Sequence, residues 1–259
     1  WTVDGDILMG ETQGASGGLD QRSAYSLSSR YRDERLNVVN RLEFRVDDSA
    51  AGADRDQWVS TNRLQYRYSN DWVVVGKADY SKALEKTTEF IDARFAEVDL
   101  GLAYRPVAHN KLNLLAMVSY VYDVDPSNQM GGLYVDEKGR VLSLEGLYQL
   151  TDRLKLGGKV AVKRSAIRLD RNQDDFISAT TTLWIARLRY HMVWKLDALV
   201  EYRKLEIDEI GDRKQGALLG LDLQLGPNMA VGVGYNFTDF NDRLTNLDYE
   251  SKGWFLNLN

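Results

Sequence analysis

The sequence predicts an all-β protein, a transmembrane antiparallel up-and-down β-barrel of about 14 strands with short periplasmic turns and longer extracellular loops. Three observations lead to this prediction. Apolar and polar residues alternate along nearly the whole chain, the connections alternate between short and long, and the apolar side of the alternation lacks charge in the middle of the strands. We interpret residues 1–259 as a single barrel domain.

The alternation with a period of two is clear between Gln215 and Leu225. Apolar residues from Ala217 to Leu225 share one face there, whereas Gly220 and Asp222 share the other. A helix would spread both sets around its circumference. Segments of this kind predict strands at residues 1–11, 22–32, 35–47, 57–68, 72–84, 92–105, 111–124, 139–150, 153–168, 177–191, 194–207, 213–225, 228–239 and 249–259.

The connections between these segments differ in length in a regular way. Short turns are expected at residues 33–34, 69–71, 106–110, 151–152, 192–193 and 226–227. Longer loops are expected at residues 12–21, 48–56, 85–91, 125–138, 169–176, 208–212 and 240–248. Outer-membrane barrels combine short periplasmic turns with longer outer loops, and an even strand number then places both termini in the periplasm.

The apolar side of the predicted strands is free of charged residues in the middle of each strand. Leu42 with Phe44, and Val231 with Val233, are examples. A Lys or Arg that faces lipid near the midplane costs about 2–4 kcal/mol, so a membrane barrel requires this pattern. A soluble β-sandwich, which is the alternative, does not require it.

The opposite side of the strands is rich in charge and is expected to line the barrel lumen. Its basic residues form rows that comprise Arg41, Arg45, Arg63, Arg67, Lys77, Lys155, Lys159, Lys163, Arg187 and Arg189. Its acidic residues include Glu43, Asp79, Glu97, Asp99, Glu145 and Asp222. Two interpretations remain open: the basic rows favour anions in a pore, or the charges neutralise one another in a network that fills the barrel.

Aromatic residues gather near the predicted strand ends, as expected for an interfacial girdle. Tyr and Trp have an apolar ring and a polar group, and therefore favour the boundary between membrane and water. The girdle is predicted to comprise Trp58, Tyr66, Tyr68, Trp72, Tyr104, Tyr120, Tyr122, Tyr190 and Trp194.

Composition narrows the possible classes of function. The chain has no Cys and three Pro. The lack of thiols fits an oxidising periplasmic route, and few prolines fit long strands that use every backbone donor. The net charge of −5 argues against a nucleic-acid partner. No stretch approaches the roughly 18 consecutive apolar residues of a membrane-spanning helix.

No group of residues indicates catalysis, a cofactor or a metal. The two histidines, His109 and His191, fall near predicted periplasmic turns. An outer-membrane phospholipase would need a Ser–His pair near the outer leaflet, and an omptin-like protease would need a His at the extracellular rim. Two isolated histidines without Cys do not suggest a zinc site.

One acidic segment has the oxygen-rich character of a calcium loop. It contains Asp170, Asn172, Asp174 and Asp175, but it lacks the Gly and the late Glu that such loops require. It is more typical of a solvated acidic loop, or of one that meets the divalent ions bridging lipopolysaccharide.

The sequence resembles a known class of envelope protein in several segments. These are GVGYNFTDFNDRLTNLDYESKGWFLNLN (232–259), RDQWVSTNRLQYRYSNDW (55–72), LGLAYRPVAHNKLNLLA (100–116), VLSLEGLYQLTDRLKLGGKVA (141–161) and RKQGALLGLDL (213–223). They are similar to the C-terminal outer-membrane barrel of very large, repeat-rich surface proteins of Gram-negative bacteria. Such barrels usually end in an aromatic residue, whereas this sequence ends at Asn259. We expect either further residues beyond it or a departure from that pattern.

The resemblance implies a barrel that forms the C-terminal part of a longer protein. We therefore expect a non-enzymatic barrel that anchors or displays a larger protein at the cell envelope. The alternatives are a porin with a mild anion preference and an export conduit for an anionic polymer. The expected partners are outer-membrane lipid and lipopolysaccharide, the barrel assembly machinery and upstream domains of the same polypeptide.

Overall fold

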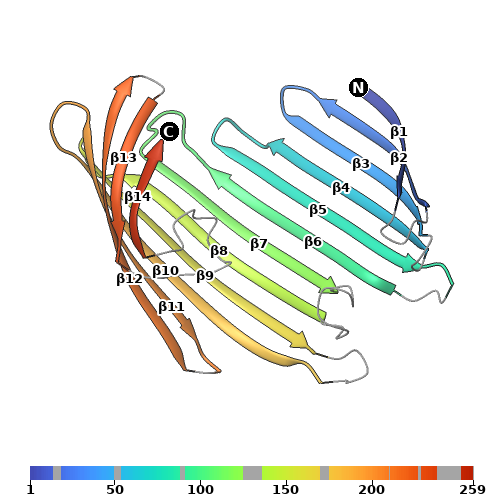
Figure 1. Ribbon diagram of the computed structural model, residues 1–259. Coiled ribbons are helices and arrows are strands. Elements are labelled where there is room, and N and C mark those ends of the chain that lie inside the picture. The colour runs from blue at the N-terminus through green and yellow to red at the C-terminus, as the bar shows by residue number, and fades with distance from the viewer. Residues whose placement is uncertain are drawn as a thin grey trace. The chain divides into compact units, whose positions relative to one another are not determined.

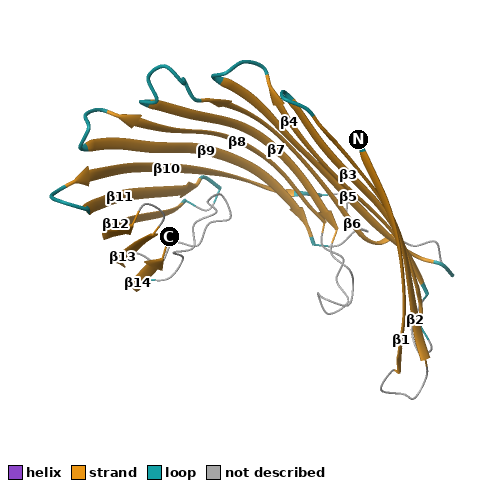
Figure 2. Cartoon of the chain, turned by 90° about the horizontal axis from the view of Figure 1, so that it is seen from above, coloured by secondary structure: helices purple, strands orange, loops and turns teal. Residues whose placement is uncertain are grey.

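The computed structural model describes residues 1–13, 19–49, 54–87, 91–124, 136–169, 175–209, 211–226, 229–237 and 252–258. All regular elements in these residues are strands, and 14 of them form one sheet in the order of the sequence (Figure 1, Figure 2). The predicted all-β class, strand number and up-and-down order are therefore confirmed. No helix in the described residues has the length and apolar character needed to cross a membrane.

The strand bounds follow the predicted segments closely. The strands are β1 (Thr2–Gln13), β2 (Leu19–Arg32), β3 (Leu36–Asp48), β4 (Arg55–Arg67), β5 (Trp72–Glu85), β6 (Ile91–Tyr104), β7 (Leu112–Val124), β8 (Asp136–Gln149), β9 (Leu154–Arg168), β10 (Ile177–His191), β11 (Leu196–Ile207), β12 (Asp212–Gly226), β13 (Met229–Asn236) and β14 (Gly253–Leu258). The start of β2 lies earlier than predicted, because its pairing with β1 continues to Leu19 opposite Gln13, beyond the apolar stretch. Parts of the predicted final strand lie outside the described residues.

The chain divides into two compact units. One comprises Trp1–Leu102, Val118–Arg140 and Ser165–Ser178, and therefore contains β1 to β5 entirely. The other comprises Ala103–Met117, Val141–Arg164 and Ala179–Asn259, and contains β11 to β14. Within each unit neighbouring strands pair antiparallel with a regular register, for example Leu42 opposite Ser60 in β3 and β4.

One face of the sheet, which we call the apolar face, carries large exposed hydrophobic side chains. Leu219, Leu221 and Leu223 alternate along β12 and are 44–45% exposed. A soluble sandwich would bury them against a second sheet. The sheet therefore has the apolar, uncovered face that a lipid-exposed barrel wall requires.

On the opposite, polar face, some residues of the second unit are buried from solvent. Ala161, Leu183, Ile185 and Leu205 form a buried cluster on β9, β10 and β11. Leu183 has no exposed surface. This cluster lies beside two deeply buried charges, Glu201 and Arg203, which are described below.

Several short turns are closed by the side chain of their first polar residue. Asp33 Oδ1 accepts the backbone N–H groups of Arg35 and Leu36, each at 2.7 Å. Ser69 Oγ accepts the N–H of Trp72 at 3.2 Å, and Thr151 Oγ1 accepts that of Leu154 at 3.0 Å. Asp, Ser and Thr favour tight turns for this reason. These closures set the register of the strands on either side.

Candidate functional site: the ion-paired polar face

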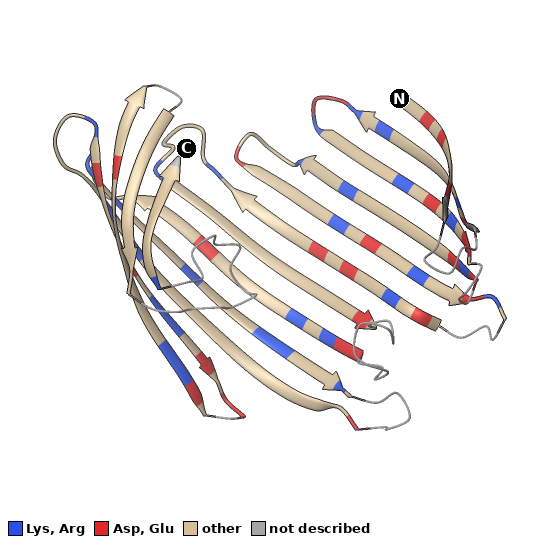
Figure 3. Ribbon diagram, viewed as in Figure 1, with Lys and Arg blue, Asp and Glu red and all other residues tan. Residues whose placement is uncertain are grey.

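The charged residues predicted to face the lumen lie on the polar face, where they form bands across neighbouring strands. Figure 3 shows basic and acidic positions interspersed across β2 to β6. The bands arise because residues two apart on one strand share a face, and the register places them beside the same face of the next strand.

On β3, one carboxylate forms ion pairs with two basic residues. Glu43 is 7% exposed, and its Oε2 lies 2.9 Å from Nη2 of Arg41. Its Oε1 accepts a hydrogen bond from Nε of Arg45. All three residues share the polar face because they alternate along one strand. The group carries one net positive charge, and both arginines remain partly exposed.

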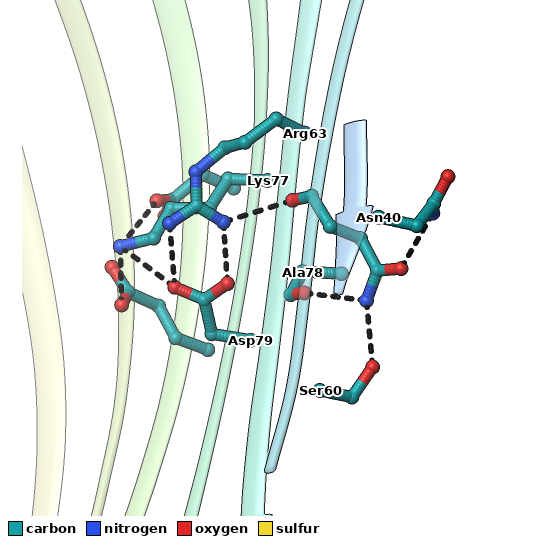
Figure 4. Close-up of polar contacts among 9 residues, drawn as sticks. Asn40, Ser60, Arg63, Lys77, Ala78 and Asp79 are labelled. Atoms are coloured by element: carbon teal, nitrogen blue, oxygen red, sulfur yellow. Dashed lines mark hydrogen bonds and ion pairs between the residues drawn. The ribbon is translucent and has the colours of Figure 1, made fainter. Parts of the chain in front are cut away.

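On β4, β5 and β6, five charged residues form a second network. The guanidinium of Arg63 donates to both oxygens of Asp79, with Nη2 to Oδ2 at 2.9 Å (Figure 4). Lys77 Nζ lies 2.5 Å from Glu97 Oε2, 3.6 Å from Asp79 Oδ2 and 3.9 Å from Asp99 Oδ2. With two cations and three carboxylates, this network carries one net negative charge.

On β10, β11 and β12, a third network contains two deeply buried charges. Glu201 is 2% exposed and Arg203 is 4% exposed. Each oxygen of Glu201 accepts a hydrogen bond at 2.5 Å, one from Nε of Arg187 and one from Nε of Arg203. A charge buried this far is tolerated only when it is paired.

Arg189 reaches across a whole strand to its partner. Its Nη2 lies 3.0 Å from Asp222 Oδ2, although β11 separates β10 from β12. Glycine at position 232 makes this possible, because a Cβ there would overlap with Oδ1 of Asp222. The carboxylate therefore occupies the space that a side chain on β13 would fill.

The structure does not bring all predicted polar-face residues into such pairs. Among the described residues, Arg67, Lys155 and Glu145 make no side-chain ion pair. A Cβ at Gly157 would contact Cβ of Arg187 at 3.4 Å. The side of β9 that carries Gly157 therefore faces the same way as the β10 arginines and lies next to them. Lys155 and Lys159 are each two residues from Gly157 and lie on the same side of β9, so they lie beside the β10 arginines.

One cluster near the loop ends was not singled out by the sequence. Asp136 on β8 is 1% exposed and forms an ion pair with Nη2 of Arg168 on β9. Lys138 Nζ lies 3.8 Å from the ring centre of Phe176, and the guanidinium carbon of Arg168 lies 4.8 Å from it. These residues lie in or beside predicted loops. The alternation of apolar and polar residues is too short there to show whether an acidic side chain is buried or solvated.

The predicted girdle aromatics occupy the apolar face or adjacent turns. Trp58 is 45% exposed, Tyr190 42%, and Trp194, in the turn before β11, 96%. Trp58 also packs against Phe44 with ring centres 4.6 Å apart. Their position at strand ends is the arrangement expected of residues at a membrane boundary.

Both histidines lie at or beside short turns between neighbouring strands. His191 Nδ1 lies 2.7 Å from Asp197 Oδ1 at the turn end of β10 and β11. His109 is exposed in the turn before β7. No group of three His, Asp or Glu in the described residues has a geometry suited to a metal. Asp170, Asn172 and Asp174 lie outside the described residues.

Solved structures with a similar fold include outer-membrane receptors and transporters. The siderophore receptor PirA from Pseudomonas aeruginosa matches with a TM-score of 0.62 and 13% identity over 90% of this chain and 44% of the receptor. The ferric enterobactin receptor PfeA from Pseudomonas aeruginosa, as a G324V mutant, gives 0.61 and 12% over 90% and 43%. The ferric citrate transporter FecA gives 0.59 and 7% over 90% and 44%.

This chain has the fold of an outer-membrane β-barrel. In that fold the apolar face meets lipid and the polar face lines the lumen. The chain spans less than half the length of these receptors. No family model matches the sequence, and no curated protein matches it. The resemblance to the barrels of repeat-rich surface proteins therefore stays a prediction.

Proposed function

We propose that this chain is an outer-membrane β-barrel that anchors or displays a larger protein at the cell envelope, and that it performs no catalysis. The observation that carries the proposal is the compensation of charge on the polar face. Among the described residues, at least six of the ten in the predicted basic rows make an ion pair with a carboxylate on the same face.

Compensated charge favours a scaffold over a selective pore. A pathway that selects anions needs a positive potential along its wall, which requires basic groups without acidic neighbours. Here the net charges of the first two networks, +1 on β3 and −1 on β4 to β6, cancel over a short distance. Paired charges also fix the wall side chains, which suits a barrel whose task is to hold its place in the membrane.

The proposed location is the bacterial outer membrane, with both termini in the periplasm. The asymmetry between short turns and longer connections supports this orientation. Outer-membrane lipid and lipopolysaccharide would contact the apolar face and its aromatic girdle. The barrel assembly machinery would insert the chain, and further domains of the same polypeptide are the proposed cargo.

Planar-bilayer recording of the refolded chain tests the anchor proposal. We expect no large, steady single-channel currents. Stable currents in most insertions would refute the anchor and favour a porin. Hydrolysis of lipid or peptide by the purified barrel, across a panel of substrates, would refute the absence of catalysis.

A channel with a mild anion preference is the second candidate. The group on β3 favours it, because Arg41 and Arg45 keep 53% and 40% of their side-chain surface exposed around a single carboxylate. If the chain conducts, the double change Arg41→Gln and Arg45→Gln should shift the reversal potential in a salt gradient toward cation preference. An unchanged potential would exclude this group as the selectivity element.

Export of an anionic polymer is a third use of the same face. It would depend on a basic ladder that includes Arg41, Arg45, Arg63 and Arg67. Neutralising all four without any change in polymer export would remove this candidate. Export that fails while the barrel still assembles would support it.

A further inference from the structure

The apolar face carries one polar, hydrogen-bonded patch in the first unit. It consists of Ser29 on β2, Asn40 on β3, and Ser60 and Asn62 on β4, and we call it the amide patch. Ser29 is the register partner of Asn40, and Asn40 is the register partner of Asn62. The patch therefore runs across three neighbouring strands.

The amide patch lies on the lipid-exposed side and in the middle of it. Asn62 shares the phase of Leu64, which is 38% exposed, and the patch is bordered on β3 by Leu42, which is 48% exposed. Along β4 it is midway between two girdle aromatics, Tyr66 toward the turn and Trp58 toward the loop. If these aromatics mark the two membrane boundaries, Asn62 lies near the midplane.

The internal hydrogen bonds of the amide patch leave part of it unused. Asn40 Nδ2 donates to Asn62 Oδ1 at 2.7 Å (Figure 4). Asn62 Nδ2 donates to the backbone oxygen of Ala78 at 2.9 Å and to Ser60 Oγ at 3.0 Å. Within the described part of the chain, Oδ1 of Asn40 accepts no hydrogen bond and the Ser29 hydroxyl makes none. Acyl chains provide no hydrogen-bond partner for these two groups, and an unsatisfied polar group in hydrocarbon costs free energy.

We propose that the amide patch is a contact surface for a second copy of this chain within the membrane. The occupant must be embedded at the same depth, and it must be uncharged, because the patch and its apolar surroundings on β2 to β4 carry no charge. A carboxamide has both a donor and an acceptor, so two copies related by a two-fold axis present matching groups to each other.

Two small residues of β5 lie beside the amide patch. Gly76 on β5 lies on the same face, and a Cβ there would contact Cβ of Leu64 at 3.4 Å. Ala78, the register partner of Asn62, adds only a methyl group. Small residues beside hydrogen-bonding side chains are typical of contacts between membrane-embedded segments. This inference goes beyond the anchor function, since anchoring requires only one copy.

Single-cysteine crosslinking tests the proposal sharply, because the chain has no cysteine of its own. In liposomes that contain only this protein, a disulfide in a single-cysteine variant can only join two copies. Ser29→Cys places the thiol in the amide patch. Leu144→Cys is the matched control, since Leu144 lies on the apolar face of β8 and is 53% exposed. In liposomes under mild oxidation, we expect covalent dimers from the first variant and only a background amount from the second.

Removal of the amides gives an independent readout. Asn40→Leu with Asn62→Leu, in the Ser29→Cys background, should lower the dimer yield by about three- to tenfold. Folding is checked by the resistance of the barrel to protease and by the electrophoretic mobility of the unheated protein. Equal crosslinking of the two cysteine variants, or a monomer by light scattering in both detergent and lipid nanodiscs, would overturn the proposal. Crosslinking to a different envelope protein in intact cells, without homodimers, would overturn it as well.

Discussion

Asp222 and Gly232 face each other across β12 and β13, and the carboxylate of one occupies the space left by the missing side chain of the other. The same carboxylate accepts a hydrogen bond from Nη2 of Arg189 at 3.0 Å. The Asp222 side chain is therefore held by Arg189 on one side and lies against the backbone of Gly232 on the other. The glycine is thus part of the charge network, although it carries no functional group.

Substitution of this glycine should disturb the network. Gly232→Ala would force the Asp222 side chain aside and weaken its bond to Arg189, at a cost of about 1–3 kcal/mol in unfolding free energy. Gly220→Ala is the matched control, because its Cβ would meet Leu199 and Val233 at ordinary distances of 3.6–3.8 Å. Urea unfolding from liposomes measures both variants. Equal stability of the two would show that Asp222 can relocate at no cost.

The buried carboxylate of Glu201 should matter more than any surface pair. Glu201→Gln removes the only negative charge of its triad and leaves Arg203 buried without a counter-ion, which costs about 3–5 kcal/mol. Asp47→Asn is the control, since Arg22, its partner, is 68% exposed and such pairs contribute about 0–1 kcal/mol. The measurement is again denaturant unfolding. A loss below that of the control would mean that water reaches the triad.

The turn at Asp33 should depend on pH. Hydrogen bonds from the backbone N–H groups of Leu36 and Arg35, and from the Tyr31 hydroxyl, hold the pKa of Asp33 below its ordinary value of 3.8. A lowered folded-state pKa stabilises the turn above the unfolded-state value, and this contribution is lost as the pH falls through the folded-state pKa.

Amide exchange measures this effect. Relative to its intrinsic rate, exchange at Leu36 should accelerate as the pH is lowered below about 4. The Ser69 turn provides the control, because its hydroxyl accepts the Trp72 amide and does not titrate in this range. Asp33→Asn should abolish the pH dependence. Identical pH profiles at Leu36 and Trp72 would contradict the assignment.

Trp194 adopts a backbone conformation that favours glycine. Its φ is +58° and it is 96% exposed in the turn before β11. Trp194→Gly should therefore be more stable than Trp194→Ala by about 0.5–1 kcal/mol, because alanine retains the strain. Both variants lose the ring, so the difference isolates the backbone. Equal unfolding free energies would show that the turn relaxes. Weaker retention in liposomes than the parent chain would support a boundary role for the ring.

The sequence by itself determined the strands and their faces. Alternation assigns every residue of a strand to one of two sides, and exclusion of charge from hydrocarbon identifies which side meets lipid. For this reason Arg63 and Asp79 could be placed on the same face, and the strand number could be counted, without coordinates. Turn chemistry at residues such as Asp33 separated the strands.

Only the tertiary structure decided which residues meet. Arg63 is directly opposite Lys77, a like charge, and its actual partner is Asp79, two residues further along β5. Alternation contains no information on register, which depends on turn closure and cross-strand pairing. The link from Arg189 to Asp222 over an intervening strand, and the contact of Asn40 with Asn62 in the lipid-exposed face, arise in the same way. Each depends on side chains from strands that the sequence orders but does not align.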